Sequence, residues 1–433
     1  MALLLAAMMC GLLSAGGLVA TTAAVAKGNP CAHAPAYGWL HTDGNWILDE
    51  HGCKVRLVSV DWYGMETTNY VPAGLNFRPY TAILAKIKSL GFNSIRFSIS
   101  EQMIRDNSKL YPRLKYIKAN PELARLHPLG ILDRIIAAAH SLGLMIILDH
   151  HGTIAAPPKT ADIEPTWNGY TEDGWIADWM ILAKRYADNP TVIGFDLLNE
   201  PHTAGPGPWT LQRYLTQGAT WGPYPSRLWN PINNWPAAAT KCGDAILSVN
   251  PHALIFVEGV QIYPDSTQPG GVETYWWGGT LRGVAVDPVI LSIPHQLVYS
   301  PHEWGPRRTD LDFFSWRTSY KSLASVYYSN WAYILHSKNP RIQAPIWLGE
   351  FNTCNFTPSC IQDTGAGTQG QWFQIFVRFL KANPEVGWAY YPINGTNAVD
   401  KRSNNSILNQ TWTGVRLPGL MRDLKPIISQ PSS

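Results

Sequence analysis

The sequence has no strong excess of charge of one sign. Its 34 Lys and Arg residues nearly balance 31 Asp and Glu residues, which leaves a formal net charge of +3 over 433 residues. It has no run of basic residues either, so we expect no nucleic-acid partner. Internal repeats, low-complexity tracts and linkers rich in Pro, Ser or Gly are also missing, which argues against a second module on a flexible tether.

Beyond the N-terminus, no apolar run is long enough to span a membrane. Residues 1–26 carry no charge and end in Ala24-Val25-Ala26, a small-x-small cleavage pattern, so we predict a signal peptide over 1–26 and a single folded domain over 27–433. The basic residues that usually begin a signal peptide are absent, and a retained anchor is the alternative. We therefore expect a secreted protein, extracellular or periplasmic, that is monomeric and not inserted in a membrane after cleavage.

Cysteine is scarce, with five residues left after removal of the predicted signal peptide. An oxidising compartment permits disulfides between them. Cys354 and Cys360 enclose a short loop, and Cys31 and Cys53 flank a predicted hairpin, so we predict these two pairs. Cys242 then remains as a buried free thiol on a helix.

Tryptophan, by contrast, is abundant, with 19 residues. The indole ring offers a flat apolar face and one N–H, which suits stacking on sugar rings that are apolar above and below and hydroxylated at the rim. The simpler interpretation is that most of these rings fill the core, so only a minority are expected to contact a ligand.

Short runs rich in β-branched residues alternate with amphipathic helical stretches, the pattern of β/α units. Residues 38–58 predict a leading β-hairpin with its turn at residues 42–45. Eight buried strands are predicted at Leu57–Trp62, Ser94–Ser98, Met145–Asp149, Val192–Leu198, Leu254–Glu258, Leu297–Ser300, Pro345–Gly349 and Gly387–Tyr391. Helices are predicted at Tyr80–Leu90, Leu129–Leu142, Gly174–Tyr186, Pro236–Val249, Asp312–His336 and Gln371–Ala382. The sequence therefore predicts an α/β fold, a (β/α)8 TIM barrel with an N-terminal β-hairpin, whose functional residues lie at the strand ends.

Two glutamates stand directly after apolar runs at predicted strand ends. Glu200 ends Phe-Asp-Leu-Leu-Asn-Glu, and Glu350 ends Ile-Trp-Leu-Gly-Glu. The fourth and seventh strands lie across the barrel mouth from one another, so we expect the two carboxylates to face each other. A pair about 5–5.5 Å apart is what a retaining glycosidase needs. A structural salt bridge is the alternative for either glutamate alone, but the two together favour catalysis.

We predict that Glu200 is the acid/base and Glu350 the nucleophile. Glu200 then needs a raised pKa to donate a proton near neutral pH, whereas Glu350 must be ionised. Asn199 is placed to bind the sugar 2-hydroxyl, and Arg96 to keep Glu350 charged and aligned.

Other ionisable residues at the strand ends allow more than one interpretation. Asp149-His150-His151 would be a metal site only with a further ligand at suitable spacing, which we do not find, so we expect no metal and no cofactor. His151 is expected to face the cleft while His150 packs or hydrogen-bonds elsewhere. Glu258 either orients a catalytic neighbour or has a purely structural role.

Over about residues 38–426 the chain resembles family 5 glycoside hydrolases, and among them secreted bacterial endo-β-1,4-glucanases. The resemblance rests first on Asn199-Glu200-Pro201 followed downstream by Gly349-Glu350-Phe351. Further matching segments are Asp61-Trp62-Tyr63-Gly64-Met65-Glu66-Thr67, Ser94-Ile95-Arg96, Ile147-Leu148-Asp149-His150-His151, Phe256-Val257-Glu258-Gly259-Val260-Gln261, Tyr275-Trp276-Trp277-Gly278-Gly279 and Val298-Tyr299-Ser300-Pro301-His302.

The resemblance implies roles for further residues. Arg96, His151 and His302 would be hydrogen-bonding residues of the active site. Trp388, or Tyr390 in its place, would lie beneath the sugar that is cleaved. The outer sugar subsites would be lined by Trp62, Trp276 and Trp277.

Trp304 is the main departure from the family pattern, which usually has at this position a Tyr that contacts the nucleophile. An indole N–H donates a hydrogen bond but cannot accept one or lose a proton, so the support of the nucleophile is altered. The predicted function is a retaining endo-β-1,4-glucanase that hydrolyses cellulose or a related β-glucan, as polysaccharide or oligosaccharide, by double displacement. The alternatives are the same chemistry on mannan or a glucoside, and a carbohydrate-binding barrel with weak or no catalysis.

Overall fold

The computed structural model describes residues 31, 38–152, 171–203, 207–222, 233–306, 314, 317–395 and 405–429. The predicted signal peptide lies outside the described residues. Among the described residues, no helix combines the length and the hydropathy needed to cross a bilayer.

Eight parallel strands form one sheet in the order β11-β8-β7-β6-β5-β4-β13-β12. A parallel bridge between Tyr299 and Ile346 joins the two outermost strands, so the sheet closes into a barrel. The strands are β4 (Val58–Trp62), β5 (Ser94–Ser100), β6 (Met145–Gly152), β7 (Val192–Asp196), β8 (Leu254–Val257), β11 (Leu297–Tyr299), β12 (Trp347–Phe351) and β13 (Gly387–Tyr390). The predicted (β/α)8 barrel is confirmed, and every strand lies within a few residues of its predicted place.

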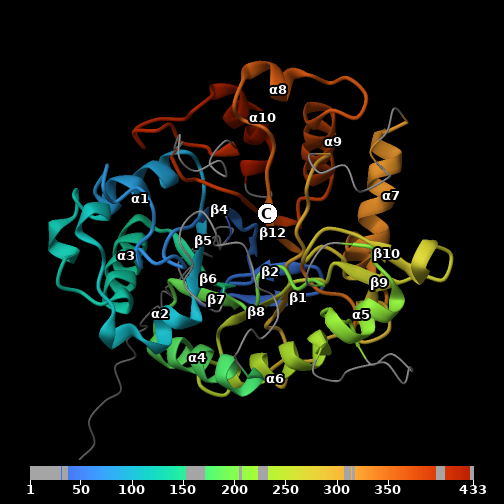
Figure 1. Cartoon of the computed structure of the whole chain (residues 1–433), viewed down its shortest axis with the longest axis horizontal. Helices are drawn as coiled ribbons and strands as arrows, with labels where there is room; N and C mark the ends of the chain where they lie inside the picture. The colour runs from blue at the N-terminus through green and yellow to red at the C-terminus, as the bar shows by residue number, and fades with distance from the viewer. Residues whose placement is uncertain are drawn as a thin grey trace, which may run out of the picture.

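Helices surround the barrel as an outer ring (Figure 1). They are α1 (Tyr80–Ser89), α2 (Glu101–Arg105), α3 (Pro128–Leu142), α4 (Glu172–Arg185), α5 (Leu211–Gln217), α6 (Trp235–Leu247), α7 (Tyr320–Asn330), α8 (Pro358–Gln362), α9 (Gln369–Ala382) and α10 (Pro418–Ile428). Capping chemistry sets several of the boundaries: the hydroxyl of Thr171 accepts from the N–H of Gly174 at the start of α4, and α3 ends at Gly143 with φ 66°. The helix predicted over residues 312–336 is shorter, because α7 ends at Asn330 and a 3-10 helix follows.

Side chains alternate along each barrel strand between the barrel interior and the helices. The apolar cluster inside the barrel includes Leu57, Ile147, Phe256 and Ala389, all at 0 % exposure. Their sequence neighbours belong instead to a much larger core between the strands and the helices. This alternation decides which residues of a strand end can reach the mouth of the barrel.

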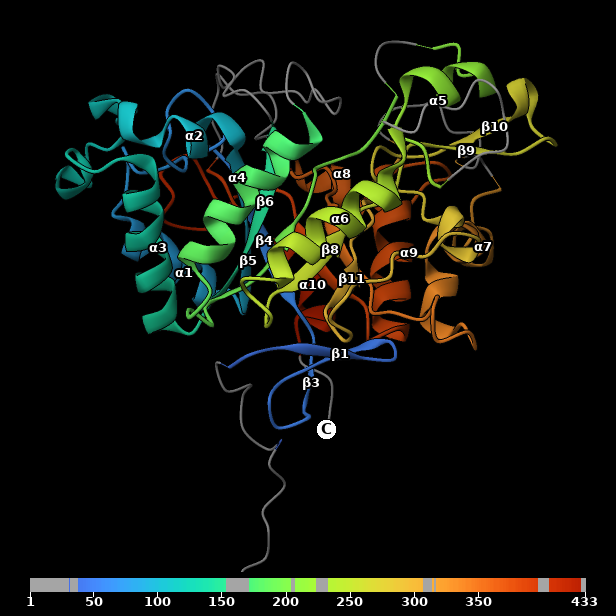
Figure 2. The ribbon, with the colours of Figure 1, turned by 90° about the horizontal axis from the view of Figure 1, so that it is seen from below.

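A small antiparallel sheet precedes the barrel and consists of β1 (His41–Asp43), β2 (Trp46–Leu48) and β3 (Lys54–Val55). It lies below one end of the barrel (Figure 2). Its Ile47 and Val55 belong to the same buried cluster as the residues inside the barrel. The predicted hairpin is therefore present, and it closes the amino-terminal end of the barrel.

The opposite end carries an extension that the sequence did not predict. A hairpin of β9 (Ile262–Pro264) and β10 (Val272–Thr274) packs with α5 around a separate apolar cluster of Tyr214, Leu215, Ile262 and Val272. Figure 2 shows this extension beside the mouth of the barrel. Because α5 follows β7 and the hairpin follows β8, the extension raises one wall of the mouth.

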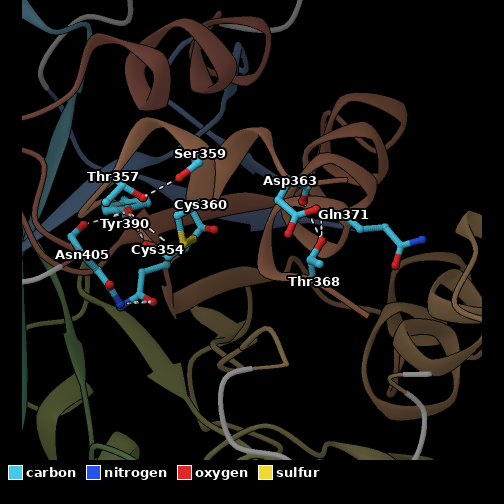
Figure 3. The surroundings of a disulfide bond; sticks show 11 residues. Cys354, Thr357, Ser359, Cys360, Asp363, Thr368, Gln371, Tyr390 and Asn405 are labelled. Atoms are coloured by element: carbon cyan, nitrogen blue, oxygen red, sulfur yellow. Dashed lines mark hydrogen bonds between the residues drawn. A yellow bond between two sulfur atoms is a disulfide. The ribbon is translucent and has the colours of Figure 1, made fainter. Parts of the chain in front are cut away.

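Both predicted disulfides are present. Cys31 is bonded to Cys53, and Cys354 to Cys360, while Cys242 is a buried free cysteine on α6. The second bond closes the loop that follows β12 (Figure 3). Close to it, the hydroxyl of Tyr390 lies 3.3 Å from the carbonyl of Thr353, which holds the start of this loop to β13, and 2.9 Å from the carbonyl of Asn405.

Candidate active site

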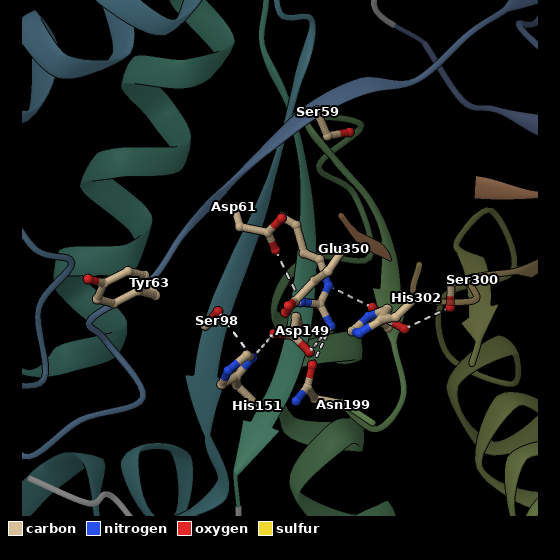
Figure 4. Close-up of polar contacts among 12 residues, drawn as sticks. Ser59, Asp61, Tyr63, Ser98, Asp149, His151, Asn199, Ser300, His302 and Glu350 are labelled. Atoms are coloured by element: carbon tan, nitrogen blue, oxygen red, sulfur yellow. Dashed lines mark hydrogen bonds and ion pairs between the residues drawn. The ribbon is translucent and has the colours of Figure 1, made fainter. Parts of the chain in front are cut away.

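The guanidinium of Arg96, fully buried at the centre of the barrel mouth, is the hub of a polar cluster. Its three nitrogens contact carboxylates from strands all around the barrel, which converge as Figure 4 shows. The contacts are Asp61 at 3.1 Å, Asp149 at 2.9 Å, Asp196 at 2.8 Å, Glu258 at 3.0 Å, Glu350 at 2.6 Å and the amide oxygen of Asn199 at 3.0 Å. One cation therefore fixes five acidic side chains, of which Asp61 and Asp196 were not singled out from the sequence.

Five buried carboxylates around one arginine cannot all be ionised without a large desolvation cost. Burial raises the pKa of Asp61 well above its ordinary value, and raises the pKa of Asp196 to about 6. For Asp149, burial is outweighed by the charges of Arg96 and His151, which hold its pKa below its ordinary value. The cluster therefore binds protons near neutral pH and keeps its net charge down.

Glu350 points into the mouth because of an irregularity in β12. Leu348 pairs with Trp388 and Phe351 with Tyr390, so β12 has two residues, Gly349 and Glu350, where β13 has only Ala389. Such a bulge re-aims side chains, and bulges are frequent beside active sites. Without the extra residue, strict alternation would direct Glu350 toward the helices.

Glu200 follows β7 and faces Glu350. Its backbone has φ 51°, a left-handed conformation that is uncommon for a residue with a side chain. One carboxylate oxygen each of Glu200 and Glu350 and a ring nitrogen of His302 all lie within 4.8 Å of one another. The two carboxylates predicted from the sequence are therefore brought together at the same rim of the barrel.

His302 bridges two acidic residues at full burial. Its Nδ1 is hydrogen-bonded to Oε1 of Glu200 at 2.9 Å, and its Nε2 lies 3.1 Å from Oε1 of Glu258. Burial disfavours the charged ring, but the charges of Glu258 and Glu350 and the bond to Glu200 outweigh it and raise the pKa of His302 well above its ordinary value. These neighbours therefore favour the protonated form of His302.

The pKa values of the two glutamates differ from the sequence-based expectation. Burial works against ionisation of Glu200, yet the hydrogen bond and charge of His302 prevail and hold its pKa below its ordinary value. Burial raises the pKa of Glu350, against the charges of His302 and Arg96. The expectation of a raised pKa for Glu200 is thus wrong for the substrate-free protein, because the hydrogen bond and charge of His302 favour the ionised carboxylate.

His151 also faces the mouth, as predicted. Its Nδ1 lies 2.7 Å from Asp149, and although burial opposes the charge, Asp149 raises the pKa of His151 to about 9. His150 points to the other side of β6, where its Nε2 lies 3.0 Å from Glu101. Consecutive residues on opposite faces cannot coordinate one metal ion, so the metal site weighed for residues 149–151 has no geometric basis here.

Two other sets of side chains in the described residues are close enough to share an ion. One is Glu200, His302 and Glu350, and the other is Asp149, Asp196 and Glu258. The second set already surrounds the guanidinium of Arg96, which supplies the positive charge there.

Two predicted sugar platforms are corrected. Trp62 and Trp388 are both at 0 % exposure, and their indole N–H groups donate to the carbonyls of Ala73 and Ile427. Asp61 and Ala389 face the interior of the barrel, so the adjacent tryptophans face the helices. Tyr390, named as the substitute for Trp388, is equally buried. None of these rings can stack on a sugar.

Trp276 is a further correction, since its side chain is 9 % exposed and belongs to the core. Its indole N–H donates to Glu303 at 3.1 Å, and the same carboxylate accepts from Tyr275 and Trp331. Burial raises the pKa of Glu303 to about 7.

Trp277, by contrast, is partly exposed and lies parallel to His202 with ring centroids 3.9 Å apart. Its place in an outer subsite stays a prediction.

Tyr391 is the aromatic residue that sequence reasoning missed. It is partly exposed, directly follows β13, and its backbone N–H donates to the carbonyl of Phe351, next to Glu350. Its ring stacks on Tyr63 at 5.8 Å and meets Trp304 edge-on at 6.3 Å. These three rings form an aromatic corner, which meets His302 through Trp304 with ring centroids 6.4 Å apart. The sequence signal that could have found Tyr391 was its position directly after the predicted buried strand, where side chains can reach the mouth of the barrel.

Comparisons with known proteins agree with this geometry. The sequence matches the family described as "Cellulase (glycosyl hydrolase family 5)" over residues 48–397. It is 35% identical to an endoglucanase of Paenibacillus polymyxa over 92% of this chain and 89% of that protein. It is 30% identical to the major extracellular endoglucanase of Xanthomonas campestris pv. campestris, over 92% of this chain and 73% of that protein. Among solved structures, a cellotetraose complex of an endocellulase from Pyrococcus horikoshii superposes with a TM-score of 0.75 at 30% identity, covering 92% of this chain and 100% of that one.

Proposed function

Because the chain belongs to the cellulase family, glycosyl hydrolase family 5, we propose that it is an endoglucanase that cleaves β-1,4-linked glucan chains internally and retains the configuration at the anomeric carbon. The protein is a glycoside hydrolase. Its relatives bear the name endoglucanase, and the structural neighbour binds cellotetraose. We assign the acid/base role to Glu200 and the nucleophile to Glu350.

The separation of the two carboxylates is the observation that carries this proposal. Oxygens of Glu200 and Glu350 approach within 4.8 Å, and both side chains are almost fully buried. A separation of about 5–5.5 Å leaves no room for water between the carboxylates and permits direct attack on the sugar, whereas inverting enzymes need about 6.5–9.5 Å. The geometry therefore supports a covalent glycosyl-enzyme.

In the first step, Glu350 forms a bond to the anomeric carbon while the bond to the leaving oxygen breaks and that oxygen takes a proton from Glu200. Arg96 holds Oε1 of Glu350, so Oε2 is the attacking atom. In the second step, a water molecule gives a proton to Glu200 and its oxygen replaces Glu350 on the anomeric carbon. Protons balance over the cycle, and no cofactor takes part.

The proton needed by Glu200 is held next to it. In the free protein, the lowered pKa of Glu200 and the raised pKa of His302 favour its position on His302, across a 2.9 Å hydrogen bond. Transfer of this proton to Glu200 accompanies its delivery to the leaving oxygen, which becomes basic as the glycosidic bond breaks. His302 thereby compensates for the low pKa of Glu200.

Neighbouring side chains supply the contacts to the sugar. Asn199, fixed by Arg96, reaches the 2-hydroxyl of the sugar attached to Glu350, and His151 donates to another hydroxyl. Tyr391, with Trp304 beside it, provides the ring surface under that sugar. Trp277 lies on the side of Glu200 through its stack on His202, so it contacts the leaving part of the chain.

Secretion, to the extracellular space or the periplasm, is part of the proposal. The two disulfides require an oxidising compartment, and the relative from Xanthomonas is described as extracellular.

The decisive experiment combines product analysis with a nucleophile variant. We expect the protein to release new reducing ends from carboxymethyl cellulose and lichenan faster than from glucomannan, and to lower the viscosity of carboxymethyl cellulose early. Glu350→Ala should abolish turnover, and azide should restore cleavage of an activated aryl cellobioside with a product of inverted configuration. Higher activity on glucomannan would move the substrate to mannan, and azide rescue with retained configuration would refute Glu350 as the nucleophile.

A further inference from the structure

Glu258 contacts three elements of the catalytic centre at once, although it lies too deep to touch substrate. Its side chain is fully buried at the end of β8. One oxygen, Oε2, accepts a 2.7 Å hydrogen bond from the backbone N–H of Glu200. The other, Oε1, lies 3.0 Å from Arg96 and 3.1 Å from His302.

The bond to the Glu200 backbone stabilises an otherwise unfavourable conformation. A non-glycine residue with φ 51° costs roughly 1–2 kcal/mol, and it persists only where its surroundings fix it. Pro201 follows, and the carbonyl of Glu200 accepts from Nδ1 of His202 at 2.7 Å. Glu258 thus holds the backbone N–H of Glu200, while His202 holds the backbone carbonyl of the same residue.

The same carboxylate fixes the ring that carries the proton. His302 lies between Glu200 and Glu258, and the carboxylate of Glu258 favours the protonated ring, while burial raises the pKa of Glu258 itself to about 8, so this buried pair binds a proton near neutral pH. Arg96 anchors Glu258 from the other side and also holds Glu350. The position of Glu258 therefore determines both where the carboxylate of Glu200 sits and what donates to it.

A glycine packs directly against this contact. At Gly278, with φ 65°, a Cβ would lie 2.2 Å from Oε2 of Glu258 and 3.2 Å from the Cα of Glu200. The N–H of Gly278 bonds to the carbonyl of Pro201, and its carbonyl accepts from Gly259 at 2.8 Å. A side chain at this position would separate Glu258 from the Glu200 backbone without changing any charge.

We propose that Glu258 is a positioning residue for the acid/base, which clamps the backbone of Glu200 in its left-handed conformation and holds the His302 ring against the Glu200 carboxylate. This inference rests on the proposed acid/base role of Glu200. It assigns to Glu258 no contact with substrate. Loss of the clamp impairs proton donation and leaves nucleophilic attack by Glu350 in place.

The test compares two substrates that differ in their need for a proton. Cleavage of cellotetraose has a poor leaving group and depends on the acid, whereas 2,4-dinitrophenyl cellobioside has a good leaving group and barely does. For Glu258→Gln we expect kcat/KM to fall at least 100-fold on cellotetraose and less than 10-fold on the aryl glycoside. Glu258→Asp should recover part of the lost activity on cellotetraose.

Gly278→Ala provides the same test with all charges kept, and it decides the question if Glu258→Gln does not fold. We expect it to show the same selective loss on cellotetraose. Glu303→Gln is the matched control, because Glu303 is also a buried carboxylate at the adjacent strand end but contacts Tyr275, Trp276 and Trp331. It should lower the melting temperature without a selective loss on cellotetraose.

The outcomes separate the inference from the proposed function. Glu200→Gln should show the largest fall in kcat/KM on cellotetraose relative to the fall on the aryl glycoside. If it does, while Glu258→Gln and Gly278→Ala lose both substrates equally or neither, the positioning role is refuted and the acid/base assignment stands. If Glu200→Gln itself loses both substrates equally, the acid/base assignment fails and the inference fails with it.

Discussion

The two aromatic residues at the end of β13 give the sharpest test of the site, because the structure assigns them opposite roles. Trp388 is fully buried, contacts Phe92 and Phe351, and donates to the carbonyl of Ile427. Truncation of a buried Trp to Ala costs roughly 3–5 kcal/mol. The unfolding entropy of about 2.1 cal/mol/K per residue gives roughly 0.9 kcal/mol/K for a chain of 433 residues, so Trp388→Ala should lower the melting temperature by about 3–6 °C.

Tyr391→Ala should show the reverse. A sugar stacked on its partly exposed ring would bury roughly 70 Å², which at about 25 cal/mol per Å² is worth roughly 2 kcal/mol, or about a 20-fold loss in kcat/KM. The assays are differential scanning calorimetry and kinetics on cellotetraose with the active fraction titrated. For the folded fraction of Trp388→Ala, kcat/KM should change less than about twofold. If Trp388→Ala instead loses kcat/KM as strongly as Tyr391→Ala and keeps its melting temperature, our assignment of the two rings is wrong.

Three further predictions concern protons and the aromatic corner. Glu350 must be ionised and burial raises its pKa, so the acidic limb of the kcat/KM profile should lie above the pKa of an ordinary glutamate. The raised pKa of His302 should extend the alkaline limb above the pKa of an ordinary histidine. A pH–rate profile on cellotetraose in which activity persists down to the ordinary glutamate range would contradict this. The pKa of His151 is about 9 in the folded state, compared with about 6.5 when unfolded, so its protonation stabilises the fold fully below pH 6.5 and no longer by pH 9. Unfolding in urea should therefore show the free energy of unfolding falling by roughly 1–3 kcal/mol over this pH range, and by much less in His151→Asn. Trp304→Tyr should retain or increase kcat on cellotetraose if the phenol hydroxyl reaches Glu350, and a collapse of kcat would show that the indole is required where it meets Tyr391.

The fold was predictable because the barrel repeats one local pattern eight times. Apolar strand runs, amphipathic helices and cap residues such as Thr171 and Gly143 agree with one another, and such agreement specifies the architecture. The extension formed by α5, β9 and β10 was not predicted, since its strands have three residues each and its apolar cluster has four buried members. Segments this short have too little periodicity to distinguish them from loops.

For the site, the position of Glu200 and Glu350 directly after apolar strands predicted that they meet at one rim, because a charged side chain there is costly unless it has a function, and the family resemblance added His302. The prediction failed for Trp62 and Trp388 because their platform role rested on the resemblance and not on the direction of their side chains. The alternation of β4 and β13 directs these rings outward instead. The alternation of side chains along a strand could have been used here: if Asp61 faces the barrel interior with Arg96, the adjacent Trp62 must face the helices. The prediction did not apply this rule to the aromatic residues.

The two proposed catalytic carboxylates owe their orientation to departures from regular backbone. Glu350 faces the mouth only because of the bulge in β12, and Glu200 only because of its left-handed φ. Gly349 is a sequence signal for the bulge in β12, whereas no glycine marks the left-handed φ of Glu200, and residue propensity alone fixes neither geometry. Each is instead fixed by buried charge, Glu350 by Arg96 and Glu200 by Glu258, which is itself anchored by Arg96. One guanidinium thus holds both sides of the catalytic pair, and this explains why the protein retains five buried carboxylates around a single cation when an apolar core would be easier to fold.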